Sequence, residues 1–119
     1  LAVLLEAALE RGRSGDPALI ARLRRRIAED PTCTPRDLAR DLDLTLDYAT
    51  RLIRGHTGVP PRRFILDERL RLAADRLAAS DETWQTICAD LGWHDDKLFL
   101  RQFRARFGLP PLRWRSRLA

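Results

Sequence analysis

Arginine side chains at helical spacing are the groups in this sequence best suited to specific chemistry. Twenty-one of the 22 basic residues are arginine, and Lys97 is the exception. A guanidinium presents a planar fork of N–H donors that matches a phosphate or the edge of a guanine base. A GC-rich genome also enriches a protein in arginine, so composition alone leaves both explanations open.

The placement of charge favours a polyanionic partner. Residues 97–119 hold seven basic and no acidic residues, a net charge of +7. Residues 1–96 hold 15 basic and 17 acidic residues, a net charge of −2. A basic segment on a near-neutral body is typical of proteins that bind nucleic acid.

No arrangement typical of catalysis accompanies the arginines. The sequence has no nucleophile beside a base, no carboxylate pair on an apolar face and no glycine-rich phosphate loop, so we predict no catalytic residue and no cofactor. Cys33 and Cys88 have no metal-ligand spacing and are expected to be reduced thiols, and no metal site is predicted. His56 and His94 are expected at a helix cap or the surface. Three tryptophans are expected in the core rather than as base-stacking groups: Trp84, Trp93 and Trp114.

Apolar residues recur at helical spacing without strand-like alternation, which predicts an all-α fold. Capping residues and prolines mark helix starts, and glycines mark helix ends. A helix over residues 1–11 and the GRSG break after it are interpreted as the end of an upstream element and a linker, residues 1–16. Further helices are expected over about residues 17–30, from 35 to about 42, after the Thr45 cap to about 57, from 60 to 80, after the Thr83 cap, from about 95 to 107 and from Pro110–Pro111 onward.

Two similar segments repeat along the chain. Residues 51–64, RLIRGHTGVPPRRF, match residues 101–114, RQFRARFGLPPLRW, at an offset of 50. Upstream the offset is 49, because the second copy has one extra residue within 94–96. The matched pairs include Thr34 with Thr83, Leu38 with Ile87, Asp41 with Asp90, Asp43 with Gly92, Arg51 with Arg101, Arg54 with Arg104 and Gly58 with Gly108.

Each copy predicts a short helix, a tight turn and a longer helix, which is the helix-turn-helix plan. The turn needs a residue that tolerates a left-handed backbone, which Gly92 does freely and Asp43 at some cost. Ala39 and Cys88 take the small position where the two helices cross. The helix between the copies, residues 61–80, would be about 30 Å long. That length is close to the 34–36 Å or so between successive major grooves of B-DNA.

These motifs resemble the AraC/XylS family of bacterial transcription regulators over about residues 17–117. The resemblance rests on IxxxLGW at 87–93, LFLRQFRARFGLPPLRWR at 98–115 and PPRRFILDERLRLAADRLA at 60–78. The sequence departs from the family pattern at Asp43, where a turn glycine is usual, and at Gly55 inside a helix. The resemblance implies a double helix-turn-helix domain that binds specific duplex DNA sequences in a bacterial transcription regulator or activator, in the cytoplasm at the nucleoid.

The N-terminal face of the second helix in each copy is expected to meet base edges in successive major grooves. Arg51 and Arg101 are the foremost candidates because arginine to guanine is the commonest specific contact; the alternative is a phosphate or a partner within the fold. A carboxylate such as Asp47 is tolerated near DNA if it accepts from cytosine or orients a neighbouring arginine. The candidates for base contact are Leu46, Asp47, Thr50, Arg51, Asp96, Lys97, Leu100 and Arg101. The candidates for phosphate contact are Thr34, Arg54, Arg62, Arg63, Arg69, Thr83, Arg104, Arg106 and Arg113.

The sequence predicts a first unit over about residues 17–59, a connecting helix over 60–80 and a second unit over 81–119.

Two other functions stay open. One is a protein-binding module that contacts RNA polymerase or a partner subunit through helix 1–11 and the arginine surface. The other is the DNA-binding part of an enzyme whose catalytic part lies upstream. The chain begins with Leu and holds no Met, so we expect a fragment of a larger, effector-responsive protein that dimerises through an upstream region, with no membrane segment.

Overall fold

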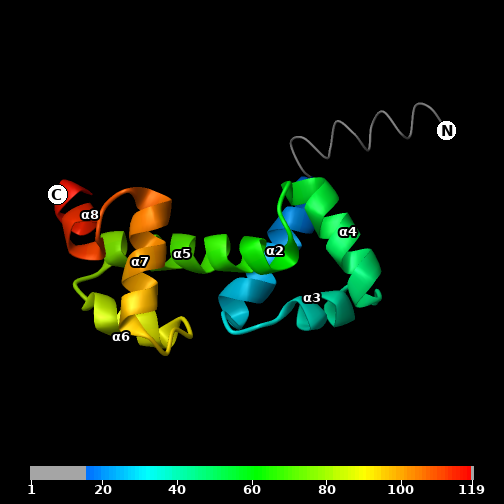
Figure 1. Ribbon diagram of the computed structural model, residues 1–119, viewed down its shortest axis with the longest axis horizontal. Coiled ribbons are helices and arrows are strands. Elements are labelled where there is room, and N and C mark those ends of the chain that lie inside the picture. Colours follow the sequence, from blue (N-terminus) through cyan, green and yellow to red (C-terminus); the bar gives the residue numbers. More distant parts are fainter. Residues whose placement is uncertain (1–15, 119) are drawn as a thin grey trace. The chain divides into compact units, whose positions relative to one another are not determined.

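The computed structural model describes residues 16–118, which form seven α-helices and no β-strand (Figure 1). The expected helix over residues 1–11 lies outside the described residues. The prediction of an all-α fold with two helix-turn-helix motifs is confirmed. The helices are α2 (Pro17–Glu29), α3 (Pro35–Asp41), α4 (Leu46–Thr57), α5 (Pro61–Ala79), α6 (Trp84–Asp90), α7 (Asp96–Phe107) and α8 (Pro111–Leu118).

Local capping interactions set the ends of these helices. The Asp16 carboxylate accepts a hydrogen bond from the backbone N–H of Ala18 at the start of α2. Thr45 does the same for α4, where its hydroxyl accepts from the N–H of Tyr48. At the other end, Gly58 closes α4 with φ +80°, a left-handed backbone that only glycine adopts without strain. The helix boundaries therefore follow from short-range interactions.

Several expected boundaries move by one residue, among them the ends of α2 at Glu29 and of α3 at Asp41. Helix α5 ends at Ala79 rather than Ser80, and the Ser80 N–H and hydroxyl both donate to the backbone carbonyl of Arg76. Helix α7 begins at Asp96 because Asp95 is its cap and accepts from the N–H groups of Lys97 and Leu98.

The chain divides into two compact units, and the boundary falls inside α5, between Leu66 and Asp67. The first unit contains α2, α3, α4 and the start of α5. The second contains the rest of α5 with α6, α7 and α8. Asp67 lies 50 residues after Pro17, the offset of the sequence repeat, so each unit consists of a helix, a helix-turn-helix pair and a closing helix.

Equivalent positions form the core of each unit. In the first unit Leu23, Ile27 and Leu38 are almost completely buried, and α4 adds Ala49 and Ile53. The residues at the matching positions of the second unit are also buried: Ala73, Leu77, Ile87, Phe99 and Phe103. The second copy thus has a smaller residue on the preceding helix and two larger ones on α7. The same arrangement of helices therefore accommodates side chains of different size, because a core tolerates hydrophobic substitutions when its total side-chain volume stays similar.

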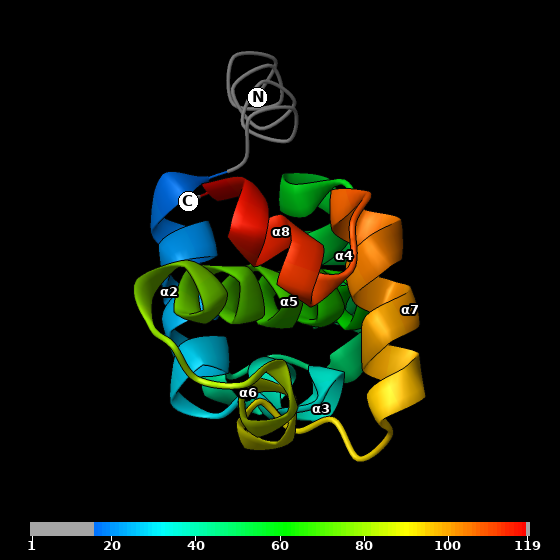
Figure 2. The same cartoon turned by 90° about the vertical axis from the view of Figure 1, so that its left-hand side faces the viewer.

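Aromatic rings fill the core of the second unit, where Trp93 is buried as expected and Trp84 and Trp114 are half-buried. Trp93 is buried with its ring 4.8 Å from that of Phe99, centroid to centroid. Trp84 stacks on Phe99 at 6.1 Å. Trp114 of α8 meets Phe103 edge to face at 5.9 Å, and α8 packs beside α7 (Figure 2). These contacts fix α7 against its neighbours on one side.

Candidate nucleic-acid interface

The two turns that precede α4 and α7 have the same hydrogen bonds. In the first, the N–H of Leu44 donates to the carbonyl of Ala39 at 2.9 Å. In the second, Trp93 donates to Cys88 at 3.0 Å. The turn residues are Asp43, with φ 58°, and Gly92, with φ 94°. Both turns thus place a left-handed residue where the sequence predicted it, and Asp43 is the only described non-glycine residue with positive φ.

An arginine on the preceding helix holds the first helix of each motif. In the first unit, Arg26 pairs with Asp41 at the end of α3, and Arg22 donates to the backbone carbonyl of Asp41 at 2.7 Å. In the second unit, Arg76 pairs with Asp90 at the end of α6 at 2.9 Å. Arg26 and Arg76 are 50 residues apart and their partners 49, so the repeat extends to this ion pair.

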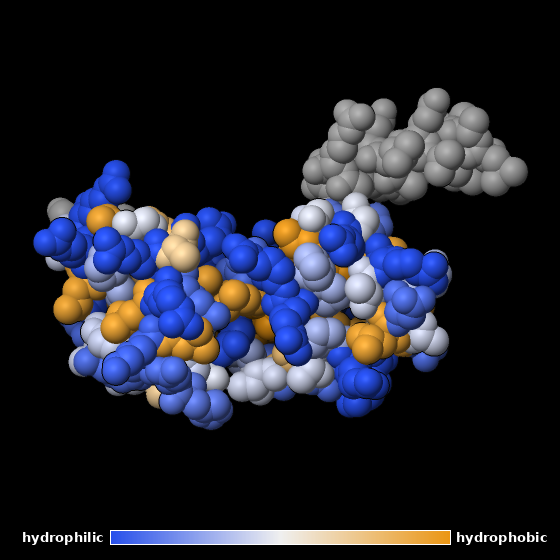
Figure 3. All heavy atoms as spheres, viewed as in Figure 1, coloured by the Kyte–Doolittle hydropathy of each residue, from blue (hydrophilic) through white to orange (hydrophobic). Residues whose placement is uncertain are grey.

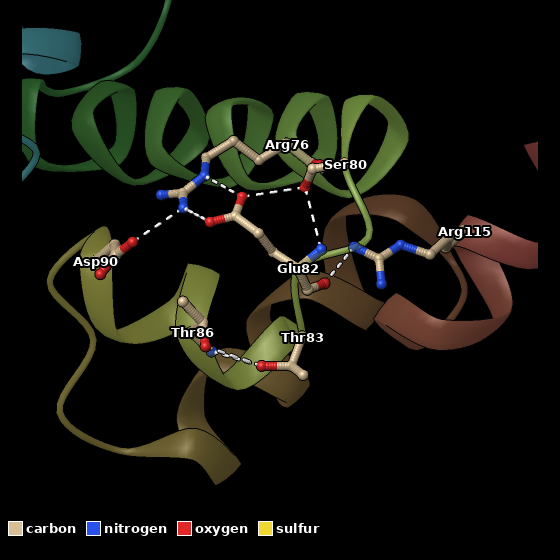
Figure 4. Close-up of polar contacts among 7 residues, drawn as sticks. All are labelled: Arg76, Ser80, Glu82, Thr83, Thr86, Asp90 and Arg115. Carbon is tan, nitrogen blue, oxygen red and sulfur yellow. Dashed lines mark hydrogen bonds and ion pairs between the residues drawn. The ribbon is translucent and has the colours of Figure 1, made fainter.

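The Arg76 pair belongs to a larger polar network around the loop between α5 and α6 (Figure 4). The Glu82 carboxylate accepts from Arg76 at 2.6 Å and from the Ser80 hydroxyl at 3.0 Å. The hydrogen bond from Arg76, followed by that from Ser80, holds the pKa of Glu82 below its usual value. From α8, Arg115 donates to the backbone carbonyls of Glu82 at 2.6 Å and Leu77 at 2.8 Å. The network joins α5, α6 and α8, and so fixes the scaffold that carries α7.

Helix α4 buries one face and exposes the other. Ala49 and Ile53 face the core, whereas the Asp47 and Arg51 side chains are 84% and 71% exposed. Leu46 is exposed at the start of the helix. Thr50 is half-buried, and its hydroxyl donates to the carbonyl of Leu46 at 2.8 Å. The four candidates on α4 therefore lie on the face opposite the core, as the spacing predicted.

Helix α7 has the same arrangement with different chemistry. Phe99 and Phe103 are buried, Lys97 and Arg101 are exposed, and Leu100 is half-buried. A surface hollow beside Arg101 is also lined by Leu100, Arg104, Ala105, Gly108 and Pro110. Two neighbouring guanidinium groups at this hollow are suited to hold a phosphate.

Asp96 has a partner within the fold. The buried thiol of Cys88 on α6 donates to its carboxylate at 3.7 Å. Burial, with the nearby Asp96 carboxylate, raises the pKa of the Cys88 thiol to about 11, so the thiol stays protonated at neutral pH. The Asp96 carboxylate thereby links the two helices of the second motif, and sequence spacing had placed it only among the base-contact candidates.

The phosphate candidates differ in their surroundings. Arg69 donates from Nε to the carbonyl of Leu91 and lies over the Trp93 ring at 4.1 Å, so it braces the second unit. Thr34 forms a capping box in which Asp37 accepts from the N–H of Thr34, so a carboxylate already occupies that helix start. Thr83 caps α6 without such a carboxylate. The other candidates are exposed: Arg54, Arg62, Arg63, Arg104, Arg106 and Arg113. Hydrophilic side chains cover much of the face drawn in Figure 3.

Sequence reasoning did not single out two residues of the site. Tyr48, the one tyrosine of the chain, is 53% exposed on the first turn of α4, and the Arg51 guanidinium lies 5.9 Å from its ring centre. Arg115 was read only as part of a basic segment, although it holds α8. Tyr48 could have been found from its position three residues before Arg51. The partners of Arg115 lie 33 and 38 residues away, and no local pattern marks them.

The histidines and cysteines show no metal-binding arrangement. His94 is exposed, His56 is half-buried with an Nδ1 that has no hydrogen-bond partner, and both cysteines are buried as free thiols. Within residues 16–118, no group of three or more His, Cys, Asp or Glu side chains could hold a metal ion. None of the described helices is both long and apolar enough to span a membrane.

Comparison with known proteins decides the family. The family model described as a helix-turn-helix domain matches residues 38–117. The chain belongs to the AraC-type helix-turn-helix family. This confirms the resemblance read from IxxxLGW and from the repeated arginine and proline positions.

Curated relatives of this AraC-type chain are larger proteins. It is 33% identical over 99 residues to the "HTH-type transcriptional activator RhaS" of Pectobacterium atrosepticum. The matched segment covers 83% of this chain and 35% of that protein. It is 30% identical over 84 residues to the "Raffinose operon transcriptional regulatory protein RafR" of Pediococcus pentosaceus. The matched segment covers 71% of this chain and 30% of that protein. The chain thus spans about a third of the length of these relatives.

Solved structures share the AraC-type fold at lower identity. The C-terminal domain of AraT, a response regulator from Geobacillus stearothermophilus, has a TM-score of 0.72 at 21% identity and covers 86% of each chain. A transcriptional regulator with an AraC-type DNA-binding domain from Chromobacterium violaceum has a TM-score of 0.71 at 19% identity. It covers 98% of this chain and 96% of that one. The fold is therefore shared by sequences that differ at most positions.

Proposed function

We propose that this domain binds specific duplex DNA sequences to regulate transcription, with α4 and α7 as its two reading helices. One observation carries the proposal. Each unit buries one face of its second helix and exposes an arginine at the equivalent position of the other face, Arg51 and Arg101. An exposed arginine near the start of such a helix can reach guanine in the major groove.

Membership of the AraC-type family supports this function. The relatives matched are named as a transcriptional activator and an operon regulatory protein. The domain accordingly acts at the bacterial chromosome as the DNA-binding part of a longer regulator, and no catalytic step is assigned to it. Contact with RNA polymerase and dimerisation through an upstream region stay predictions.

The length of α5 supports a two-groove mode of binding. This helix has 19 residues, or about 28 Å at 1.5 Å per residue. Successive major grooves are separated by roughly 34–36 Å along B-DNA. One chain would then contact an asymmetric site of about 15–20 base pairs, bent slightly toward the protein.

Selection from a random duplex pool, followed by a salt titration on the best sequence, tests the function. We expect enrichment of two short elements about one helical turn apart. With five or more phosphate contacts, the plot of log K against log salt should have a slope near −4 or steeper, at about −0.9 per contact. A chain with both Arg51→Ala and Arg101→Ala is the control, and it should retain weak binding without enrichment. No enrichment by the parent chain, or a slope near zero, would overturn the proposal.

A further inference from the structure

The two reading helices differ in charge at the positions that flank their arginines. Four residues before Arg51 stands Asp47, whereas four residues before Arg101 stands Lys97. Three residues before these arginines stand Tyr48 and Leu98. Side chains separated by three or four residues are neighbours on a helix surface, so these differences act directly on the two arginines.

On α4, Arg51 has two partners from its own helix. Its guanidinium lies 3.2 Å from the Asp47 carboxylate and 5.9 Å from the centre of the Tyr48 ring. All three side chains are mostly exposed, so they lie on the open face and not in the core. At this exposed site the Asp47 carboxylate partly offsets the charge of Arg51, and the two contacts favour side-chain directions that keep the guanidinium beside them.

On α7 the equivalent neighbour is a second cation. Lys97 and Arg101 repel each other at this spacing. Among the described side chains, no carboxylate forms an ion pair with either of them. The helix carries Asp96, Lys97, Arg101, Arg104 and Arg106, a net charge of +3. The corresponding helix α4 carries Asp47, Arg51 and Arg54, a net charge of +1 with His56 neutral.

These arrangements have different consequences on DNA. An arginine that is already oriented loses less conformational freedom when it forms two hydrogen bonds to a base. A neutralised arginine is also less attracted to phosphates, which carry no sequence information. Cations without an ion-pair partner raise the affinity for any sequence. Each phosphate that they neutralise releases counterions, and this release strengthens binding.

We infer that Asp47 and Tyr48 are positioning residues that orient Arg51, so that Arg51 discriminates between bases more sharply than Arg101, while α7 supplies the larger share of the salt-dependent affinity. This division of roles rests on the proposed DNA-binding function. It assigns a role to Tyr48, and it assigns Asp47 to the orientation of Arg51 rather than to a base of its own.

The first test locates the base pair that Arg51 reads. Random-duplex selection is run with the full 119-residue chain and with Arg51→Ala, and the base pair whose preference is lost is identified. Asp47→Asn should then relax the same base pair by roughly threefold to tenfold, the range expected for immobilising one long side chain. It should also strengthen binding to unrelated duplexes and steepen the salt slope by about 0.9, because Arg51 is no longer neutralised.

Tyr48 is tested by a conservative and a truncating change. Tyr48→Phe keeps the ring face beside the Arg51 guanidinium and should keep the preference at that base pair. Tyr48→Ala removes the ring and should relax it. A purely structural role for Tyr48 would instead lower the affinity for all duplexes by the same factor, and circular dichroism would report any loss of helix.

Two further variants separate position from net charge. Asp81→Asn removes one negative charge from an exposed site outside both reading helices and should leave the preference at the Arg51 base pair unchanged. Lys97→Asp gives α7 the acidic neighbour that α4 has. It should flatten the salt slope by more than the single unit expected for one lost cation.

The outcomes distinguish this inference from the proposed function. If the parent chain selects no sequence, the DNA-binding function itself fails. If the parent selects a sequence but Asp47→Asn and Tyr48→Ala leave the Arg51 base pair unchanged, the positioning role is wrong. If Asp47→Asn relaxes a different base pair from Arg51→Ala, Asp47 contacts a base directly and the inference is overturned.

Discussion

Arg101 and Arg104 lie three residues apart on α7, both are exposed, and we predict different roles for them. Arg101→Ala should cost about 1–3 kcal/mol of binding and relax the preference at one base pair. Arg104→Ala should weaken binding to all sequences alike and flatten the salt slope by about one unit. Quantitative binding to the selected duplex and to single-base variants of it measures both. If the two variants weaken every duplex equally, Arg101 does not read a base.

Gly55 and Ala105 are equivalent positions of α4 and α7, and they provide a matched pair for helix stability. Both are exposed, and a Cβ at Gly55 would meet no atom within 4 Å. Gly55→Ala should therefore stabilise the chain by up to about 1 kcal/mol, and Ala105→Gly should destabilise it by a similar amount. Urea denaturation followed by circular dichroism checks both. A destabilising Gly55→Ala would show that this glycine has a role beyond helix formation.

At the scale of elements, Arg115 attaches α8 to the end of α5 and the loop that follows. Arg115→Ala leaves the carbonyls of Leu77 and Glu82 without this donor, and we expect a loss of about 1.5–3 kcal/mol, the range for a hydrogen bond with a charged partner. Arg117→Ala, an exposed position on the same helix, is the control and should change stability by less than about 0.5 kcal/mol. Tryptophan fluorescence reports on this unit because all three tryptophans lie in it. Equal stabilities of the two variants would contradict the role of Arg115.

The same network predicts how acid weakens the second unit. Hydrogen bonds from Arg76 and Ser80 lower the pKa of Glu82 below its ordinary value of 4.5, so the folded state binds this proton more weakly than the unfolded chain. The stabilisation is therefore fully present above about pH 4.5 and is lost as pH falls through the lower folded pKa. The parent should be more stable than Glu82→Gln near neutral pH, and the difference in melting temperature should shrink toward about pH 3. A difference that does not depend on pH would show that the charge of Glu82 contributes nothing.

At the scale of the whole molecule, the two-groove proposal predicts a fixed spacing between the half-elements of the DNA site. Inserting two base pairs between them rotates one element by roughly 70°, given 10–10.5 base pairs per turn. Binding should fall well below that of the parent site, because the gain from linking two reading helices is lost when both cannot bind together. Insertion of about ten base pairs restores the rotation but not the distance, and serves as a second comparison. Affinity within about twofold of the parent for the two-base-pair insertion would mean that one motif binds alone.

Much of the fold could be predicted because its signals are local. Asp16, Thr45 and Gly58 act on backbone groups within four residues, so the sequence pattern alone indicates where helices begin and end. The repeat added the turn residues Asp43 and Gly92, since both copies need a left-handed backbone at the same place. The exposed faces of α4 and α7 followed from helical periodicity once their buried faces were recognised.

The tertiary structure decided which polar side chains are already engaged. Arg69 was expected at phosphates, yet it lies against Trp93, 24 residues further on. Asp96 accepts from Cys88 on another helix, and Arg115 reaches carbonyls 33 and 38 residues away. Long flexible side chains choose partners by proximity in space, which a one-dimensional pattern does not contain. The sequence by itself therefore determined the helices, the repeat and the exposed arginines, whereas the packing of distant segments decided which charges brace the fold and which are left at the surface.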